Sequence, residues 1–463
     1  MNVRQTLAVV VGLLAGNALL AQDELSAILV RDDGPALVAL LQKQPAVRDT
    51  KIEGGWPPLN VAAARGSLAC VRELLAAKAA VDSTDAQGRT PAQRAAEAGH
   101  RAVAQLLCQH GARVDLDVAM VAGDEAWVRR WLGENAGEVP WTTQVAAAKA
   151  GATATLRVAL PRAAARPDNP IGPQQPGLAF FALAHADTLT MVLDHGEAMD
   201  EPLQGNWGLG GSSSLLHSAA SIDAGASLDV LLNRGFPVDE PDEHGNTALV
   251  AACHAAAPQA IATLLGKGAS LARGPELLRM VCECLARGTN AVQRQRRHRA
   301  AGLLLAHGVP LDAFAAVTLG RHRELAALVA AEPKLASEAT SEPLLVRAAL
   351  CTDREALRIL LDAGAPVGVT GRDGYTPLHW AVFWDAPDCV ELLLERGAEV
   401  SPAAANGLTP LHEAVRCSHP EQAGRLLRAG ADRTKKDQQG KLPLDYAAPE
   451  LRAKFEAVFA AAR

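Results

Sequence analysis

The sequence predicts an all-α fold, a solenoid of stacked helix–turn–helix units. One observation is a Leu-Leu-x-x-Gly pattern whose glycines recur at intervals of about 33 residues, from Gly235 to Gly268 and again from Gly364 through Gly397 to Gly430. A fixed period of this length is typical of stacked repeats. The other is composition, since 49% of the residues are hydrophobic but only 3% are aromatic. A core made of Leu and Ala favours helices over a β-sandwich or barrel.

Further residues place more units in the same register. Lys78 stands one period before Gly111, and longer intervals indicate insertions or degenerate units. The remaining glycines of the pattern are Gly196 and Gly308. We expect about 12 to 14 units, the first near residues 25–49 and the last a polar cap with a final helix from Pro449 to Ala462.

Each unit consists of a turn followed by two helices with recognisable ends. After the turn glycine Gly374, Thr376 can cap a helix whose first position is Pro377, where a missing N–H costs nothing. A second helix follows from Cys389 to Glu395, and Gly397 ends it with a positive φ. The apolar positions are Leu378, Ala381 and Val382 in the first helix and Val390, Leu393 and Leu394 in the second. One such pair cannot bury its own apolar surface, so each unit needs neighbours.

These motifs resemble the ankyrin repeat. Thr376-Pro377-Leu378-His379 and Thr409-Pro410-Leu411-His412 match its Thr-Pro-Leu-His motif. Weaker copies are Pro57-Pro58-Leu59-Asn60, Thr90-Pro91-Ala92-Gln93, Thr247-Ala248-Leu249-Val250 and Leu442-Pro443-Leu444-Asp445. The resemblance extends over residues 23–463 and is strongest at 55–116 and 341–446. It implies a curved stack whose concave face, formed by hairpin tips and first helices, binds other proteins.

Residues 1–21 are typical of a secretory signal peptide. Arg4 precedes an apolar run from Leu7 to Leu20, which is shorter than the roughly 20 residues of a membrane span. We expect cleavage after Ala21, export to the periplasm or the medium, and no membrane insertion after cleavage. The alternative is an uncleaved membrane anchor.

The rest of the chain divides into two predicted blocks. We expect an N-terminal repeat block at 22–160 that is degenerate after residue 116, and a C-terminal block with its cap at 178–463. Five prolines at 161–177 indicate an extended connector between them. Within the degenerate part, Ala119 to Leu132 and Gln144 to Leu160 look helical but lack the turn motif. A Gly- and Ser-rich loop is expected at 205–214.

The motifs of common catalytic and metal sites are absent or incomplete. His412-Glu413 begins like a His-Glu-x-x-His zinc site, but Arg416 stands where the second ligand is needed. We therefore expect His412 to bond within its own repeat, and we expect no catalytic residues, no metal and no cofactor. The eight cysteines are expected to be mostly buried thiols. The alternatives are disulfides, or a metal held by Cys282 and Cys284 with His254 or His298.

A basic cluster accompanies an enlarged unit that ends at Gly308. The predicted basic patch comprises Arg294, Arg296, Arg297 and Arg299, with Arg287 and His298 nearby. An enlarged loop with these side chains could recognise a partner rich in carboxylates or phosphates. The alternative is a solvated helix start.

Three of the rare aromatic residues fall on one unit at positions expected on the concave face. They are Tyr375, Phe383 and Trp384, and aromatic residues are frequent at interface hot spots. The predicted protein-binding residues are Arg372, Asp373, Tyr375, Phe383, Trp384, Leu408, Arg416 and Lys441. The alternative is that Phe383 and Trp384 pack under a neighbouring helix. Trp380 is expected in the core.

These observations favour a monomeric exported scaffold that binds another protein and is not an enzyme. One alternative is a secreted effector or inhibitor that acts on a host or competitor protein. Another is an enzyme or cofactor carrier with a site in residues 117–214. The formal net charge of -6 argues against a nucleic-acid partner.

Overall fold

The fold is a helical repeat stack, as the sequence predicts. The computed structural model describes residues 24–52, 55–162, 178–194, 215–242, 244–283, 291–338, 342–371 and 373–461. Over these ranges the chain forms helices and no strand, and Ile52 and Trp56 form an isolated bridge. The predicted signal peptide, the loop at 205–214 and the connector from residue 163 onward lie outside the described residues.

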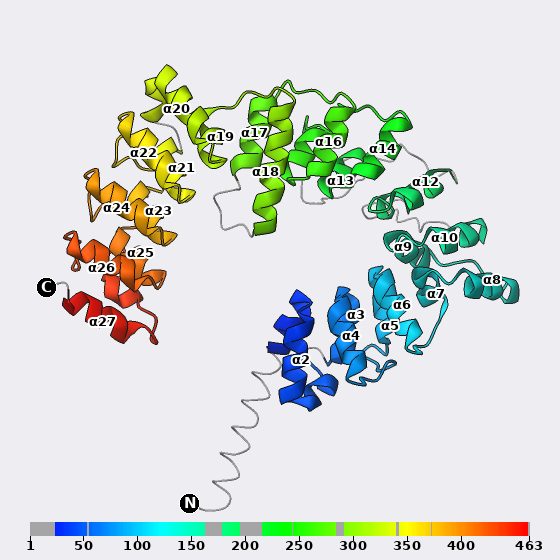
Figure 1. The fold of residues 1–463 in the computed structure, drawn as a ribbon. Coiled ribbons are helices and arrows are strands. Elements are labelled where there is room, and N and C mark those ends of the chain that lie inside the picture. Colours follow the sequence, from blue (N-terminus) through cyan, green and yellow to red (C-terminus); the bar gives the residue numbers. More distant parts are fainter. Residues whose placement is uncertain are drawn as a thin grey trace, which may run out of the picture. The chain divides into compact units, whose positions relative to one another are not determined.

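Contacts divide the chain into two compact units, Met1–Ala251 and Ala252–Arg463. The first unit runs from blue to green in Figure 1. After a helix at 24–31, its elements are α2 (Gly34–Lys43), η1 (Pro45–Asp49), α3 (Pro58–Arg65), α4 (Leu68–Ala76), α5 (Pro91–Ala98), α6 (Arg101–Gln109), α7 (Leu116–Ala122), α8 (Glu125–Glu134), α9 (Trp141–Lys149), α10 (Thr153–Ala159), η2 (Leu160–Arg162), α11 (Leu178–Phe181), α12 (Ala186–Asp194), α13 (Leu215–Ser221) and α14 (Gly225–Asn233). Helix α15 (Ala248–His254) crosses the division.

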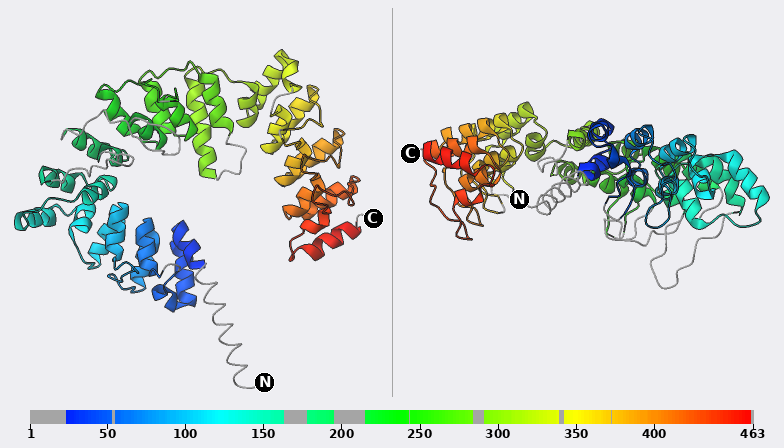
Figure 2. Two further views of the ribbon diagram at one scale, coloured as in Figure 1. Left: turned by 180° about the vertical axis from the view of Figure 1, so that it is seen from behind. Right: turned by 90° about the horizontal axis from the view of Figure 1, so that it is seen from below.

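The second unit continues with helix pairs to the C-terminal cap. Its elements are α16 (Pro258–Gly266), α17 (Gly274–Glu283), α18 (Ala291–Ala306), α19 (Ala313–Thr318), α20 (His322–Ala331), η4 (Pro333–Ala336), α21 (Leu344–Leu350), α22 (Arg354–Asp362), α23 (Pro377–Phe383), α24 (Pro387–Glu395), α25 (Pro410–Arg416), α26 (Pro420–Arg428), η5 (Pro443–Tyr446) and α27 (Arg452–Ala461). The pairs follow one another from green to red in the left view of Figure 2. No helix in the described ranges is long and apolar enough to cross a membrane.

Each complete repeat begins with a hairpin that has the same backbone hydrogen bonds. In the hairpin before α23, the Gly371 N–H donates to the Tyr375 carbonyl at 3.0 Å and the Gly374 N–H donates to the Gly371 carbonyl at 3.1 Å. The same pair of bonds recurs in the hairpins that start at Asp85, Asp242, Ala404 and Asp437. Their turn glycines all have a positive φ, between 71° and 81°. The predicted turn positions are therefore confirmed.

Neighbouring hairpins approach so closely that a side chain at the turn would collide. The Ala405 N–H donates to the Asp373 carbonyl at 2.9 Å, so that the hairpin of one repeat bonds the hairpin of the next. A Cβ added at Gly407 would lie 2.6 Å from the Gln438 nitrogen. Glycine is required there both for its positive φ and for this contact.

The ends of the second helices also follow the predicted register. Lys78 has a φ of 63°, and Gly111, one period later, has a φ of 83°. The other described glycines of the pattern have φ between 82° and 94°. A left-handed residue at this place lets the chain leave the helix while its last carbonyls stay bonded.

The region after residue 116 contains two further helix pairs rather than two longer helices. The first predicted stretch divides at Gly123, which has a φ of 84°, and Asp124 caps α8 through the Trp127 N–H at 3.0 Å. The second divides at Gly151, with a φ of 62°. A left-handed residue cannot continue an α-helix, so each stretch turns back on itself.

A buried polar side chain in the first helix links four of the described repeats to the next hairpin. His379 accepts the Thr376 N–H at Nδ1, at 3.1 Å, and donates from Nε2 to the Leu408 carbonyl, also at 3.1 Å. The same bond to a carbonyl 29 residues later is made by Asn60 to Arg89, His217 to Asn246, and His412 to Lys441. One side chain thus holds its own helix start and the next hairpin. The prediction that His412 bonds within its repeat is also confirmed, since its Nδ1 accepts the Thr409 N–H.

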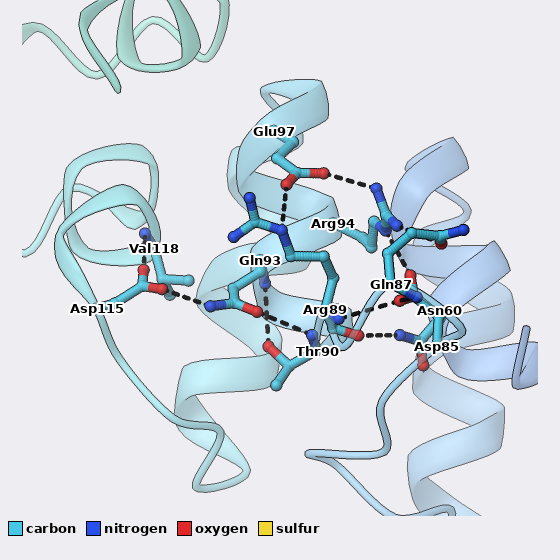
Figure 3. A network of polar contacts seen from close by, with 10 residues as sticks. All are labelled: Asn60, Asp85, Gln87, Arg89, Thr90, Gln93, Arg94, Glu97, Asp115 and Val118. Atoms are coloured by element: carbon cyan, nitrogen blue, oxygen red, sulfur yellow. Dashed lines mark hydrogen bonds and ion pairs between the residues drawn. The ribbon is translucent and has the colours of Figure 1, made fainter. Parts of the chain in front are cut away.

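Gln93 performs the same function where the next hairpin is missing. Its carbonyl oxygen accepts the Thr90 N–H at 3.0 Å, and its amide donates to Asp115 at 2.7 Å. Asp115 in turn caps α7 by accepting the Val118 N–H at 3.0 Å. Figure 3 shows this chain of bonds, which attaches the first degenerate pair to the complete repeat before it.

The core consists mainly of Leu and Ala from both helices of each pair, as the composition predicts. In the second unit its fully buried members include Leu325, Leu345, Leu357, Leu378, Leu393, Leu411 and Leu426. The stack ends with α27, which buries Phe455 and Phe459 while most of its other side chains stay exposed. The predicted polar cap is therefore present and begins at Arg452 instead of Pro449.

A buried arginine joins three helix pairs of the second unit. The Arg347 side chain is 2% exposed and donates to the Cys282 carbonyl at the end of α17 and to the Thr318 hydroxyl in α19, the latter at 3.0 Å. Its guanidinium also bonds Glu342 at 2.9 Å and lies 4.5 Å from the centre of the Phe314 ring. These partners compensate the cost of burying the charge.

The buried histidine makes the stability of the second unit depend on pH. Burial lowers the pKa of His379 from 6.5 to about 4, so the unfolded chain binds the proton more tightly. We expect stability to fall as the pH drops from 6.5 towards 4, because neutral His379 must then be protonated on unfolding. Urea unfolding followed by circular dichroism at several pH values measures this.

The control is His379→Gln, because Gln93 already makes these bonds without titrating. We expect His379→Ala to lose about 2 to 4 kcal/mol by leaving a buried N–H and a carbonyl unpaired, and His379→Gln to lose less and to weaken the pH dependence. Equal pH dependence in the wild type and His379→Gln would contradict this role.

Candidate protein-binding surface

The aromatic surface consists of Tyr375, Trp380, Phe383 and Trp384, which lie on one repeat. Tyr375 follows the turn glycine of the hairpin, and the other three lie along and just after α23. Trp384 is 36% exposed and is the only aromatic residue among the strongly exposed large hydrophobic residues of the described chain. The other three rings are half-buried.

The four rings contact one another in sequence. Ring centroids are 5.1 Å apart for Tyr375 and Trp380, 5.7 Å for Trp380 and Phe383, and 5.0 Å for Phe383 and Trp384. These separations and the tilted or edge-on geometry are favourable for aromatic pairs. The aromatic surface is therefore ordered before any partner binds.

A buried carboxylate in the next repeat holds both edges of this surface. Glu413 in α25 is fully buried. Its Oε1 accepts the Tyr375 hydroxyl at 2.6 Å, and its Oε2 accepts Arg416 Nη2 at 2.6 Å. The Arg416 guanidinium lies 5.7 Å from the centre of the Phe383 ring. Because its charge is paired and hydrogen-bonded, Glu413 can remain buried.

The structure exposes four of the predicted binding residues, among them Trp384, and buries one. Asp373, Arg416 and Lys441 are exposed, whereas Arg372 lies outside the described residues. Leu408 is only 8% exposed, so its prediction as a surface residue is wrong. Its backbone leaves the hairpin towards α25 and accepts the His379 bond, which turns the apolar side chain inward.

The last hairpin presents a smaller version of the same arrangement. The Lys441 ammonium lies 5.1 Å from the centre of the Tyr446 ring, and the Tyr446 hydroxyl donates to Asp437. Lys441 is exposed and Tyr446 is half-buried. The two features lie two repeats apart, with Glu413 and Arg416 in the repeat between them, and Lys441 extends the candidate surface towards the cap.

Sequence reasoning missed Glu413 and misplaced Trp380. In the sequence Glu413 is noticed first as part of an incomplete zinc motif. A glutamate three residues before Arg416 on a helix also indicates an ion pair. Trp380 takes the position that Arg94 and Glu413 occupy in their repeats, and it is half-buried between Tyr375 and Phe383. Its large ring reaches beyond the core into the surface cluster.

The predicted basic patch is on a helix and not in a loop. Arg294, Arg296, Arg297 and Arg299 all belong to α18. Arginine, glutamine and alanine are good helix formers, and the inserted residues therefore lengthen the helix. Arg297 turns inward and donates to the Val281 carbonyl at 3.3 Å, while the other three are exposed.

The seven cysteines within the described ranges are all free thiols. Cys70, Cys253, Cys282 and Cys389 are buried. Burial raises the pKa of Cys253 to about 12, which makes this thiol a poor nucleophile and metal ligand. No group of three metal-ligating side chains lies together among the residues that the structure describes.

A cavity of about 380 Å³ opens beside the first helices of the N-terminal unit. Its lining residues are Arg89, Glu97, Asp117, Trp141, Thr142, Val145, Ala146, Lys149 and Phe181. Arg89 pairs with Glu97 at 3.1 Å, and the Lys149 ammonium lies 5.0 Å from the centre of the Phe181 ring. The cavity is large enough to receive a side chain of a partner.

Together, these observations define a helical repeat scaffold that carries an aromatic surface on one repeat. Residues 27–118 and 313–404 match the model for ankyrin repeats in three copies, and residues 406–438 match the model for a single ankyrin repeat. These segments therefore contain repeats of the ankyrin type. Ankyrin repeats generally mediate protein–protein interactions.

Solved structures of ankyrin repeat domains are also similar to this chain. The chain is similar to the crystal structure of the human ASB11 ankyrin repeat domain, with 25% sequence identity and a TM-score of 0.32. The similarity covers 54% of this chain and 98% of that chain. No curated protein matches the sequence.

The two tyrosines of the chain allow the hydroxyl–carboxylate bonds to be tested directly. Burial and the bond to Glu413 raise the pKa of Tyr375 to about 12, and the bond to Asp437 raises that of Tyr446 to about 12. After rapid pH jumps, we expect little phenolate absorbance until the pH is well above 10. In a Tyr446→Phe background, Glu413→Gln should lower the remaining pKa. Titration of the native protein near pH 10 would contradict both bonds.

Proposed function

We propose that this chain is an exported, monomeric scaffold that binds another protein through the concave face of its repeats and performs no catalysis. The observation that carries the proposal is the aromatic surface held in place by buried Glu413. The presence of ankyrin repeats, which generally bind proteins, supports it. The partner is a protein and not a nucleic acid, in keeping with the net charge of -6.

The composition of the surface suits a protein interface. Trp384 and Phe383 offer apolar area, and Arg416 offers a guanidinium that is 41% exposed. Trp, Tyr and Arg are the residues most often found at interface hot spots. Because Glu413 and the ring contacts already fix the surface residues, binding costs little side-chain entropy.

Export is proposed from the first 21 residues. A short apolar run after a single basic residue resembles a secretory leader, and Gln22 would begin the mature chain. Cysteines that are buried thiols are compatible with an oxidising compartment, because burial limits their access to oxidants and to one another.

The aromatic surface predicts a local loss of binding. We expect the double variant Phe383→Ala with Trp384→Ala to lose at least tenfold in affinity for its partner, because truncating central aromatic residues typically costs about 2 kcal/mol or more. The partner is first captured by crosslinking and mass spectrometry from the native exported fraction. Its affinity for each variant is then measured with purified proteins.

The matched control is Ile222→Ala, which removes an apolar side chain that is 55% exposed elsewhere. We expect this variant to bind like the wild type. If the double variant retained full affinity, or if Ile222→Ala weakened binding as much, the assignment of this surface would be wrong.

The leader predicts a defined mature end. When the full chain is expressed in a bacterial host, we expect the protein in the exported fraction to begin at or next to Gln22. Intact-mass measurement and N-terminal sequencing check this. Recovery of the full chain with Met1, confined to the cytosol, would contradict the proposal.

A further inference from the structure

Helix α18 carries an exposed basic end that its packing does not explain. The helix has 16 residues, whereas the second helices α16, α22 and α24 have nine each. Its C-terminal half buries Ala300, Ala301 and Leu304 in the core, but every described side chain from 292 to 299 except Arg297 is exposed. The additional length therefore projects from the stack and contributes little to the core.

The positive charges on this end are unfavourable next to the positive end of the helix dipole. The first turns of a helix favour acidic residues, because the N-terminal end of the macrodipole is positive. Residues 284–306 contain no Asp or Glu, and α18 has four arginines in its first nine positions. A sequence that breaks a local rule without a packing gain indicates a functional requirement. Here the acidic residues that would balance the arginines are missing from the helix and from the residues before it.

Few acidic side chains of the described structure are available to pair with these arginines. In the described structure Arg294 and Arg299 have no ion pair or hydrogen bond to another side chain. The nearby acids are engaged, since Glu324 pairs with Arg321 at 3.4 Å and Glu283 pairs with Arg279 at 3.5 Å. Burial and the positive charges of Arg294 and Arg321 lower the pKa of His298, which indicates a positive potential around this part of the helix.

Helical spacing groups the exposed side chains by face. Arg296 and Arg299, three residues apart, lie one turn from each other on the outer stripe, and Val292 begins the same stripe. Val292 is 66% exposed. Arg294 lies on the flank next to His298. The basic face, defined as Arg294, Arg296 and Arg299 with Val292, thus combines guanidinium groups with one apolar contact.

We propose that the basic face of α18 binds an acidic segment of a protein, with carboxylates spaced about one helical turn apart. Every strong cation from residue 268 to 333 is arginine and none is lysine, and the guanidinium fork matches a carboxylate in a bidentate manner. Val292 adds a contact suited to a protein side chain. This proposal does not depend on the aromatic surface.

The test uses the purified full chain and a labelled deca-glutamate peptide as the probe, with binding followed by fluorescence anisotropy. We expect measurable binding that weakens as salt increases, and no binding of deca-glutamine. The double variant Arg294→Gln with Arg299→Gln should bind at least about tenfold more weakly. The control, Arg65→Gln with Arg72→Gln, removes the same charge from exposed positions of the first unit and should bind like the wild type.

A second variant separates binding from folding. Val292→Asp places an acid in the first turn of α18, where it should stabilise the helix, yet it should weaken deca-glutamate binding. Full binding by this variant or by the arginine double variant would overturn the proposal. Equal loss in the control pair would also overturn it, and so would tighter binding of a short DNA duplex than of deca-glutamate.

Discussion

The hydrogen bond from a buried first-helix side chain to the carbonyl of the next hairpin is the interaction that sets the stacking of four described repeats. It joins Asn60, His217, His379 and His412 to a residue 29 positions later in each case. Without it, the hairpin carbonyl and the N–H of the helix cap would be buried and unpaired, at a cost of about 1 to 3 kcal/mol each. Apolar packing between Leu and Ala is non-directional, so these polar bonds are what set the register between repeats.

That register also creates the candidate binding surface. Because the hairpin before α23 is fixed against α25, Tyr375 reaches Glu413 in the next repeat, and Glu413 holds Arg416 beside Phe383. The aromatic surface is thus a consequence of stacking as well as of one unusual repeat. The basic face of α18 has a different origin. It lies on a helix end that extends beyond the stack, and repeat geometry does not constrain it.

The period, the turns and the helix ends could be predicted because they depend on local chemistry repeated along the chain. Even Lys78, which replaces the glycine of the pattern one period before Gly111, has the left-handed backbone of this position, with a φ of 63°. Other features depend on tertiary contacts. Leu408 is buried by the direction in which its hairpin leaves, and Glu413 matters through Tyr375, 38 residues earlier. The sequence predicts two long helical stretches in the degenerate region, because nothing in an alanine-rich sequence distinguishes Gly123 and Gly151 as the left-handed residues that end a helix.

The most direct test of the proposed binding surface is a photo-crosslinking scan of the full chain in its native host. A photoreactive amino acid is placed singly at Phe383 or Trp384 on the concave side, and at Glu391 or Glu395, which are exposed on helix α24 of the same repeat. We expect crosslinks to one protein from positions 383 and 384, and few crosslinks from positions 391 and 395. Crosslinks mainly from positions 391 and 395 would contradict it, since they would place the partner on the opposite helices of the stack.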